Sequence, residues 1–100
     1  MLEKEVEKYF VKELRQRNCL VWKFTSPGTL GVPDRVVIFP TGDVAFVELK
    51  APGEQLRDIQ AFRRKQLTHR NAICWVIDSK EQVDKFTAVF GLKFKNPWRH

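Results

Sequence analysis

The chain has 100 residues, a hydrophobic fraction of 43% and a formal net charge of +6. This length and composition are typical of one globular domain with a modest core. No apolar run is long enough to span a membrane, and the charged start Met1–Glu5 is unlike a secretion signal. We therefore expect a cytoplasmic protein with no membrane partner. The positive net charge favours an anionic binding partner.

The N-terminal segment, residues 2–17, has the periodicity of an amphipathic helix. Its apolar stripe consists of Val6, Phe10 and Leu14. Glu3 projects within about 20° of the last two members of that stripe, at 100° per residue. We therefore expect Glu3 to face inward, with Glu7 as the second choice. The alternative is a first-turn glutamate favoured only by the helix dipole.

Asn18 is a candidate left-handed cap at the end of this helix, and residues 19–24 form the first predicted strand. Residues 25–32 are rich in turn formers and predict a long loop, of the kind that contacts substrate when it lies beside a site. Cys19 and Cys74 lack the spacing of zinc ligands. We expect both to be reduced, buried thiols.

Two β-type runs, residues 35–39 and 44–47, flank a Pro40–Asp43 turn and predict a hairpin. The hairpin would bring Asp34, before its first strand, beside Glu48 at the end of its second. Strand alternation then puts Glu48 and Lys50 on one face and Leu49 on the other. Two carboxylates and one ammonium would converge in a pocket suited to a hard divalent cation, with the lysine facing a water or a phosphate oxygen.

The same residues allow a plainer interpretation, since Pro-Asp is a common turn and Glu-x-Lys at a strand end is often a solvated charge pair. The apolar context favours the metal site. Residues 44–49 are almost continuously hydrophobic, which predicts a strand covered on both faces. A carboxylate there needs a partner or a metal because burying it alone is costly.

A turn at residues 51–54 precedes a second predicted helix, from about Gln55 to His69. Its apolar side consists of Leu56, Ile59 and Leu67, with Phe62 at one flank. Gln60 lies beside this stripe on the helical wheel. Arg63 falls inside the stripe, where an arginine either extends its charged group to solvent or points into a polar pocket. Asn71 suits a left-handed turn after the helix.

Residues 72–77 form a fourth predicted strand, and Ser79 with Gln82 has the spacing of a capping box for a third helix. The core face of that helix consists of Val83, Phe86, Val89 and Phe90, and Gly91 ends it. The tail, residues 92–100, mixes basic and aromatic side chains. Three interpretations of this tail are open: a DNA-contacting arm, a segment that docks on a second subunit, or a frayed terminus.

Gly31-Val32-Pro33-Asp34 followed by Glu48-Leu49-Lys50 resembles the motif of the PD-(D/E)xK nuclease superfamily. Within it, the chain is similar to the VRR-NUC (virus-type replication-repair nuclease) family, in the stand-alone form of phages and bacteria. The residues that extend the likeness are the N-terminal glutamate helix, Lys23–Gly28, Lys50–Gly53, Leu56, Gln60 and Val76–Ser79.

This resemblance implies one restriction-endonuclease-like α/β domain over residues 1–100, with a mixed four-stranded sheet flanked by helices in the order αβββαβα. It implies a divalent-metal-dependent endodeoxyribonuclease that uses Mg²⁺ or Mn²⁺ and no small-molecule cofactor. The implied catalytic residues are Asp34, Glu48, Lys50, Gln60 and Glu3, and the implied metal ligands are Asp34, Glu48, Glu3 and the Leu49 carbonyl. Lys50 would orient or deprotonate the attacking water, or contact the scissile phosphate.

The expected DNA contacts are Lys23, Ser26, Arg35, Arg57, Arg63 and Arg64. So short a chain has no room for a separate sequence-reading module, which favours recognition of DNA shape. We therefore expect a homodimer that cleaves Holliday junctions or related branched DNA, in a bacterial cell or a phage-infected host. The alternatives are a flap or single-strand-specific repair nuclease, a non-catalytic basic DNA-binding module, and a structural subunit of a larger assembly.

Overall fold

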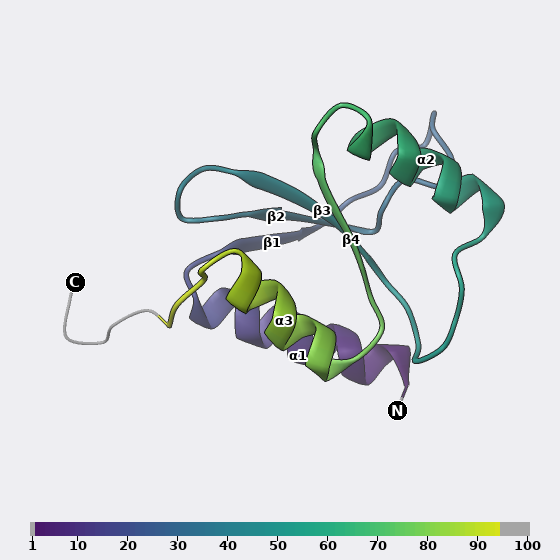
Figure 1. Cartoon of the computed structure of the whole chain (residues 1–100). Helices are drawn as coiled ribbons and strands as arrows, with labels where there is room; N and C mark the ends of the chain where they lie inside the picture. The colour runs from purple at the N-terminus through teal and green to yellow at the C-terminus, as the bar shows by residue number, and fades with distance from the viewer. Residues whose placement is uncertain (1, 95–100) are drawn as a thin grey trace.

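The computed structural model describes residues 2–94. The helices are α1 (Glu3–Gln16), α2 (Asp58–Thr68) and α3 (Lys80–Val89), and the strands are β1 (Leu20–Lys23), β2 (Arg35–Ile38), β3 (Val44–Leu49) and β4 (Ile73–Ile77), as drawn in Figure 1. This is the predicted order αβββαβα. The end of the basic and aromatic tail, residues 95–100, lies outside the described residues, so its predicted role as an arm stays a prediction.

The four strands form one mixed sheet in the order β1-β2-β3-β4. The first three are antiparallel, whereas β4 runs parallel to β3 after the α2 crossover. Arg35 of β2 pairs with Val47 of β3, so the predicted hairpin and its register are confirmed. The hairpin turn is closed by a 2.8 Å bond from the Gly42 N–H to the Phe39 carbonyl.

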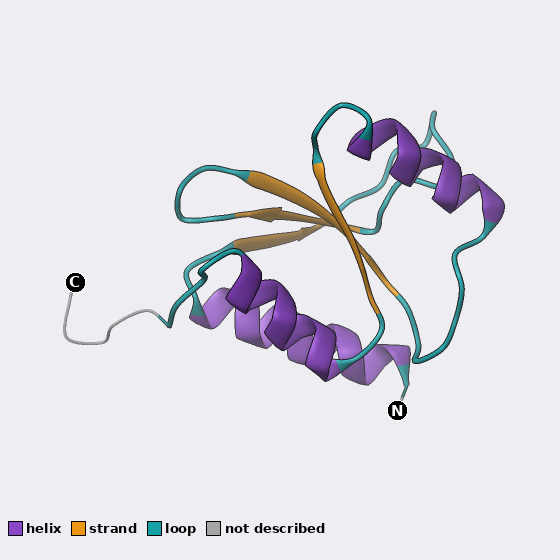
Figure 2. Ribbon diagram, viewed as in Figure 1, coloured by secondary structure: helices purple, strands orange, loops and turns teal. Residues whose placement is uncertain are grey.

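The helices cover the sheet unequally. Figure 2 shows α1 and α3 side by side on one face, with α2 on the other side. The buried apolar core lies between the sheet and the α1–α3 layer, and its largest members include Phe10, Leu14, Leu49 and Phe86. The face toward α2 is mixed, with Phe24 and Phe46 beside the polar Glu48 and Gln60.

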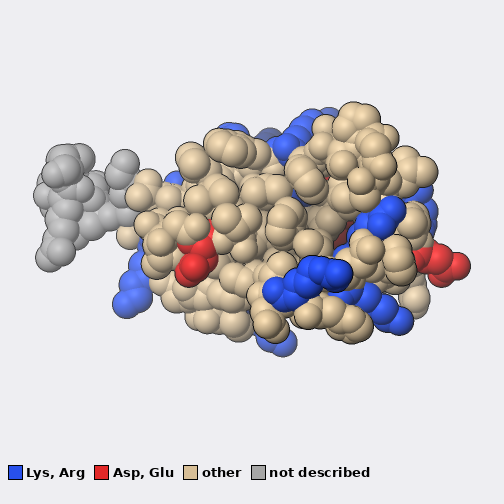
Figure 3. Space-filling view, turned by 90° about the horizontal axis from the view of Figure 1, so that it is seen from above, with Lys and Arg blue, Asp and Glu red and all other residues tan. Residues whose placement is uncertain are grey.

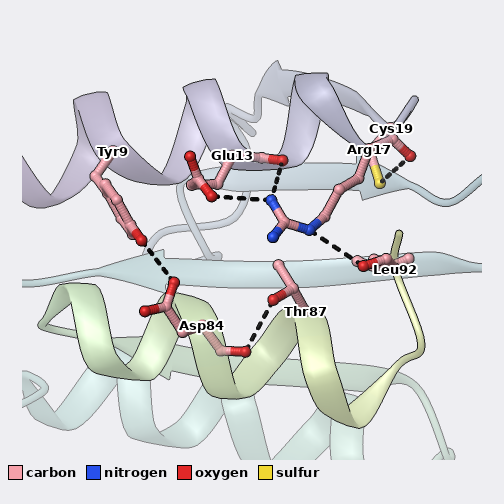
Figure 4. A network of polar contacts seen from close by, with 7 residues as sticks. All are labelled: Tyr9, Glu13, Arg17, Cys19, Asp84, Thr87 and Leu92. Atoms are coloured by element: carbon pink, nitrogen blue, oxygen red, sulfur yellow. Dashed lines mark hydrogen bonds and ion pairs between the residues drawn. The ribbon is translucent and has the colours of Figure 1, made fainter. Parts of the chain in front are cut away.

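Hydrogen bonds connect α1 to α3 and to the segment that follows α3 (Figure 4). The Tyr9 hydroxyl donates a 2.6 Å bond to Asp84, and this bond is the main reason that the pKa of Tyr9 is raised to about 12. Arg17 forms a 3.0 Å ion pair with Glu13 and donates to the Leu92 carbonyl at 3.1 Å. These contacts hold both helices at the core face.

The predicted chain turns are confirmed. Asn18 and Asn71 have φ angles of 63° and 62°, the left-handed conformation that asparagine tolerates. Ser79 caps α3 by accepting a bond from the Gln82 N–H at 3.2 Å. Cys19 and Cys74 are buried and form no disulfide, as expected.

Two predictions about helix faces are wrong. Helix α2 begins at Asp58 rather than near Gln55, and its buried residue is Gln60, while Ile59 and Phe62 are exposed. Leu56 and Leu67 of the predicted stripe are half-buried, but the position that α2 buries most is the one that meets the Glu48 carboxylate, where Gln60 donates a hydrogen bond. Val89 of α3 is also exposed, because it lies at the end of the helix, whereas Phe90 packs against the core as predicted.

Candidate active site

Asp34 and Glu48 meet where the hairpin strands return to each other. Asp34 directly precedes β2, and the Arg35–Val47 pairing brings it beside Glu48 in β3. The two carboxyl groups are close enough that the charge of Asp34 raises the pKa of Glu48. Lys50 directly follows β3 and is 7% exposed, against 8% for Glu48. The structure thus brings these three predicted site residues together.

Asp34 has one oxygen bonded and one oxygen free. Its Oδ2 accepts the Leu49 N–H at 3.4 Å, whereas its Oδ1 is buried without a hydrogen-bond partner. Burial is the main cause that raises the pKa of this carboxyl. A buried carboxylate oxygen without a donor is costly by itself, and a hard cation is a fitting partner for it.

Of the two carboxyl groups, Glu48 has the more strongly raised pKa. Burial and the neighbouring charge of Asp34 raise its pKa to about 7, while the charge of Lys50 acts in the opposite direction. The two ion pairs of the described residues are Arg17–Glu13 and Arg35–Glu7, so neither engages Lys50. The Lys50 ammonium thus lies near enough to act on Glu48, without an ion-pair contact within residues 2–94.

Gln60 connects α2 to this acid pair. Its Oε1 accepts the Arg57 N–H at 2.9 Å, and its Nε2 donates to Glu48 Oε2 at 3.3 Å. A backbone N–H can only donate, so it must meet the amide oxygen, and the amide NH₂ must face the carboxylate. The start of α2 thereby orients a donor onto Glu48.

The Leu49 carbonyl points toward the same edge of β3 as the Leu49 N–H that bonds Asp34, because paired residues of an antiparallel ladder exchange both bonds. Continuing the β2–β3 register by two residues puts Pro33 opposite Leu49. Proline has no N–H to donate. The proline of the motif therefore leaves this carbonyl without its ladder donor, beside Asp34.

The glutamates of α1 behave differently from the prediction. Glu3 is exposed rather than turned inward, although its charge is close enough to raise the pKa of both Asp34 and Glu48. The wheel gives a direction around the helix axis, but Glu3 lies in the first turn, at the end of the packed interface. Glu7, the second choice, is bound to Arg35 at 3.1 Å. Within residues 2–94, no three His, Cys, Asp or Glu side chains form a ready-made metal cluster.

Comparisons with known proteins agree with this geometry, although no family model matches the chain. The chain is 40% identical over 87 residues to "Putative nuclease p44" of Acyrthosiphon pisum secondary endosymbiont phage 1, over 87% of the chain and 94% of that protein. It is also similar to a solved VRR_NUC domain, with a TM-score of 0.81 and 32% identity, over 86% of the chain and 94% of the domain. The chain belongs to the VRR-NUC family.

Membership in the VRR-NUC family confirms the resemblance and the restriction-endonuclease-like α/β fold predicted from the motif. None of the helices between Leu2 and Phe94 is long and apolar enough to cross a membrane.

The predicted DNA contacts of this VRR-NUC domain occupy different environments. Lys23, Arg57 and Arg64 are exposed, and Ser26 is half-buried in the loop before β2. Arg35 is buried in its ion pair with Glu7, a structural role that the sequence did not indicate. Seen from above, Lys and Arg side chains lie around a recess in the part of the surface that includes α2 (Figure 3).

Arg63 anchors the loop before β2 to α2. Its Nε donates to the Leu30 carbonyl at 2.7 Å and its Nη1 to Gln66 at 3.0 Å. Gly31 lies so close to α2 that an added Cβ would be 2.8 Å from the Ile59 carbonyl oxygen. The sequence showed Gly31 only as part of the motif, since this contact joins segments far apart in the chain.

Next to the acid pair, the VRR-NUC domain has a pocket of about 410 Å³ that sequence analysis missed. Its apolar wall includes Phe24, Pro33 and Phe46, and its rim carries Arg63 and Arg70. The two phenylalanine rings are 5.8 Å apart. Such a wall suits a planar apolar group beside an anion.

Proposed function

We propose that this VRR-NUC protein is a divalent-metal-dependent DNA endonuclease that cleaves Holliday junctions or related branched DNA as a homodimer. The observation that carries the proposal is the buried Glu48 beside the half-buried Asp34, whose Oδ1 is buried without a partner, next to Lys50, which forms no ion pair within residues 2–94. The phage relative that is named a nuclease supports the reaction class.

The residues present fit a Mg²⁺ or Mn²⁺ ion. Asp34 Oδ1, a Glu48 oxygen and the Leu49 carbonyl would hold it, and Glu3 would add charge directly or through water. When bound, such an ion supplies Lewis-acid chemistry, which neutralises charge developing on the phosphate and acidifies a nearby water. Because all these ligands are oxygens, the set suits a hard cation.

The reaction is hydrolysis of a phosphodiester, in which a water oxygen bonds to phosphorus and the bond from phosphorus to a sugar oxygen breaks. Lys50 would orient or deprotonate that water, or hold a non-bridging oxygen of the scissile phosphate. Gln60 would keep Glu48 in its productive orientation by donating from Nε2. The exposed Lys23, Arg57 and Arg64, the half-buried Arg63, and Ser26 would contact the DNA backbone.

Size and symmetry support the proposal of branched DNA and a homodimer. One acid pair serves one scissile phosphate, and a two-fold dimer would set two such sites across a four-way junction. A domain of this size has little surface of its own for reading bases. Recognition of DNA shape through phosphate contacts needs less protein surface, so we infer that this nuclease uses it.

A flap or single-strand-specific repair nuclease is the second candidate. It is favoured by the pocket of about 410 Å³ beside Pro33, whose Phe24 and Phe46 rings could stack an unpaired base. In that case the enzyme would act as a monomer on one strand.

A panel of labelled duplex, flap, single-stranded and four-way DNA with Mn²⁺, combined with light scattering, tests the proposal. We expect a dimer and paired nicks in the four-way DNA. A monomer that cuts only flaps or single strands would favour the second candidate. Binding without any metal-dependent cleavage would leave a non-catalytic DNA-binding module.

A further inference from the structure

We propose that the outer face of α1 is a second DNA-binding track, which holds the phosphate backbone on the side of the acid pair away from α2. This inference rests on the proposed nuclease function and extends it, since the DNA contacts expected from the sequence lie mainly on α2 and the loop before β2.

The track is a groove of about 640 Å³ between α1 and the edge strand β1. Its cationic lining consists of Lys4, Lys8, Lys12, Arg15, Lys23 and Arg35. Glu7 is the acidic lining residue, and it is paired with Arg35 at 3.1 Å. In the described part of the chain, the other cations of the groove have no carboxylate in ion-pair contact.

The spacing of the lysines suits a phosphate backbone. Lys4, Lys8 and Lys12 follow each other at every fourth residue, which puts successive lysines about 6 Å apart along the helix. This rise is comparable to the separation of neighbouring phosphates on one nucleic-acid strand. Like charges at this spacing disfavour an isolated helix, and an anion along the row would remove that repulsion.

The groove leads to the acid pair. A smaller pocket of about 250 Å³ is lined by Glu7, Lys23 and Arg35 of the groove and also by Asp34. A strand whose scissile phosphate meets Asp34 and Glu48 would therefore continue over Lys23 onto the lysine row. On the other side of the site, the same strand would meet the arginines of α2.

The test compares binding of labelled duplex and four-way DNA in EDTA by three proteins over a range of salt concentrations. These are the wild type, Lys8→Gln/Lys12→Gln, and Lys80→Gln/Lys85→Gln, whose exposed lysines lie on α3 outside the groove and whose net charge changes equally. All four substituted lysines are exposed. Circular dichroism checks that each variant is folded.

We expect the groove variant to bind more weakly and to lose about 1.8 units of salt slope on duplex, at about 0.9 per phosphate contact. The Lys80/Lys85 variant should keep the wild-type slope, and Lys8→Arg/Lys12→Arg should bind like the wild type. Equal slopes for the groove variant and its control, or no DNA binding by the wild type, would overturn the track. This binding test needs no metal, so absence of cleavage in the separate Mn²⁺ panel would refute the nuclease proposal without deciding this one.

Discussion

Gln60 donates a hydrogen bond from its side-chain Nε2 to Oε2 of Glu48 across 3.3 Å, in a buried position. The amide oxygen of Gln60 is meanwhile held by the Arg57 N–H at 2.9 Å. One side chain thus serves both the start of α2 and the orientation of a carboxylate of the candidate site. Loss of this side chain should affect stability and activity through separate bonds.

We expect Gln60→Leu to lower the Mn²⁺-dependent cleavage rate about 10- to 100-fold, as for groups that orient metal ligands. It should also cost about 1 kcal/mol of unfolding free energy, because the Arg57 N–H loses its acceptor. Single-turnover cleavage and urea unfolding measure the two effects. Gln55→Leu, at an exposed position before the helix, is the matched control and should alter neither. Full activity in Gln60→Leu would remove Gln60 from the site.

The pH dependence of stability follows from Glu48. Its pKa is raised from 4.5 in the unfolded chain to about 7 in the native protein, mainly by burial. Between these two pH values, Glu48 keeps its proton in the native state but has lost it in the unfolded state. Without metal, the free energy of unfolding should therefore fall as the pH rises from about 4.5 to about 7. Urea unfolding at pH 5 and pH 8 should show a smaller fall in Glu48→Gln. An equal fall in both proteins would contradict the assignment.

Metal should reverse this trend. Ionised Glu48 and Asp34 are the ligand forms, so Mn²⁺ should stabilise the wild type more at pH 8 than at pH 5. Thermal unfolding with and without Mn²⁺ measures the difference. Glu48→Gln should lose most of the stabilisation at pH 8, whereas Asp43→Asn, in the exposed hairpin turn, should keep it. Stabilisation independent of pH would argue against this pair as the ligands.

Gly31 should tolerate alanine less well than Gly42 does. Both have positive φ angles, +82° at Gly31 and +92° at Gly42. An added Cβ at Gly31 would lie 2.7 Å from Ile59 Cγ1 and 2.8 Å from the Ile59 carbonyl oxygen. An added Cβ at Gly42 would meet open space. Gly31→Ala should therefore cost about 1–3 kcal/mol more than Gly42→Ala, as overpacking does. Urea unfolding decides between them, and equal costs would mean that the loop moves off α2 freely.

The hairpin and the acid pair could be predicted from the sequence because their determinants are local. The Pro40–Asp43 turn sets the register, and that register brings Asp34 to Glu48. The buried state of Glu48 also followed, since the residues before it are almost all apolar. These features depend on alternation and turn chemistry within one short segment.

The buried side of α2 and the position of Glu3 could not be predicted in this way. Helical periodicity assumes an apolar partner, whereas α2 turns Gln60 toward the carboxylate of Glu48. The wheel also cannot tell that Glu3 lies at the exposed end of the α1 interface. The lysine row of α1 gave no signal in the sequence as part of a groove, because its neighbour Lys23 comes from another element.

The measurement that tests the account most directly is Mn²⁺-dependent cleavage of four-way DNA by the wild type, Asp34→Asn and Lys50→Ala, with EDTA as the control. Asp34→Asn removes a buried charge beside Glu48, so the protein should stay folded. We predict cleavage by the wild type only, with both variants reduced by about a thousandfold or more, the scale of losing an essential catalytic group. Undiminished cleavage by either folded variant, or wild-type cleavage in EDTA, would contradict a metal site built on Asp34, Glu48 and Lys50.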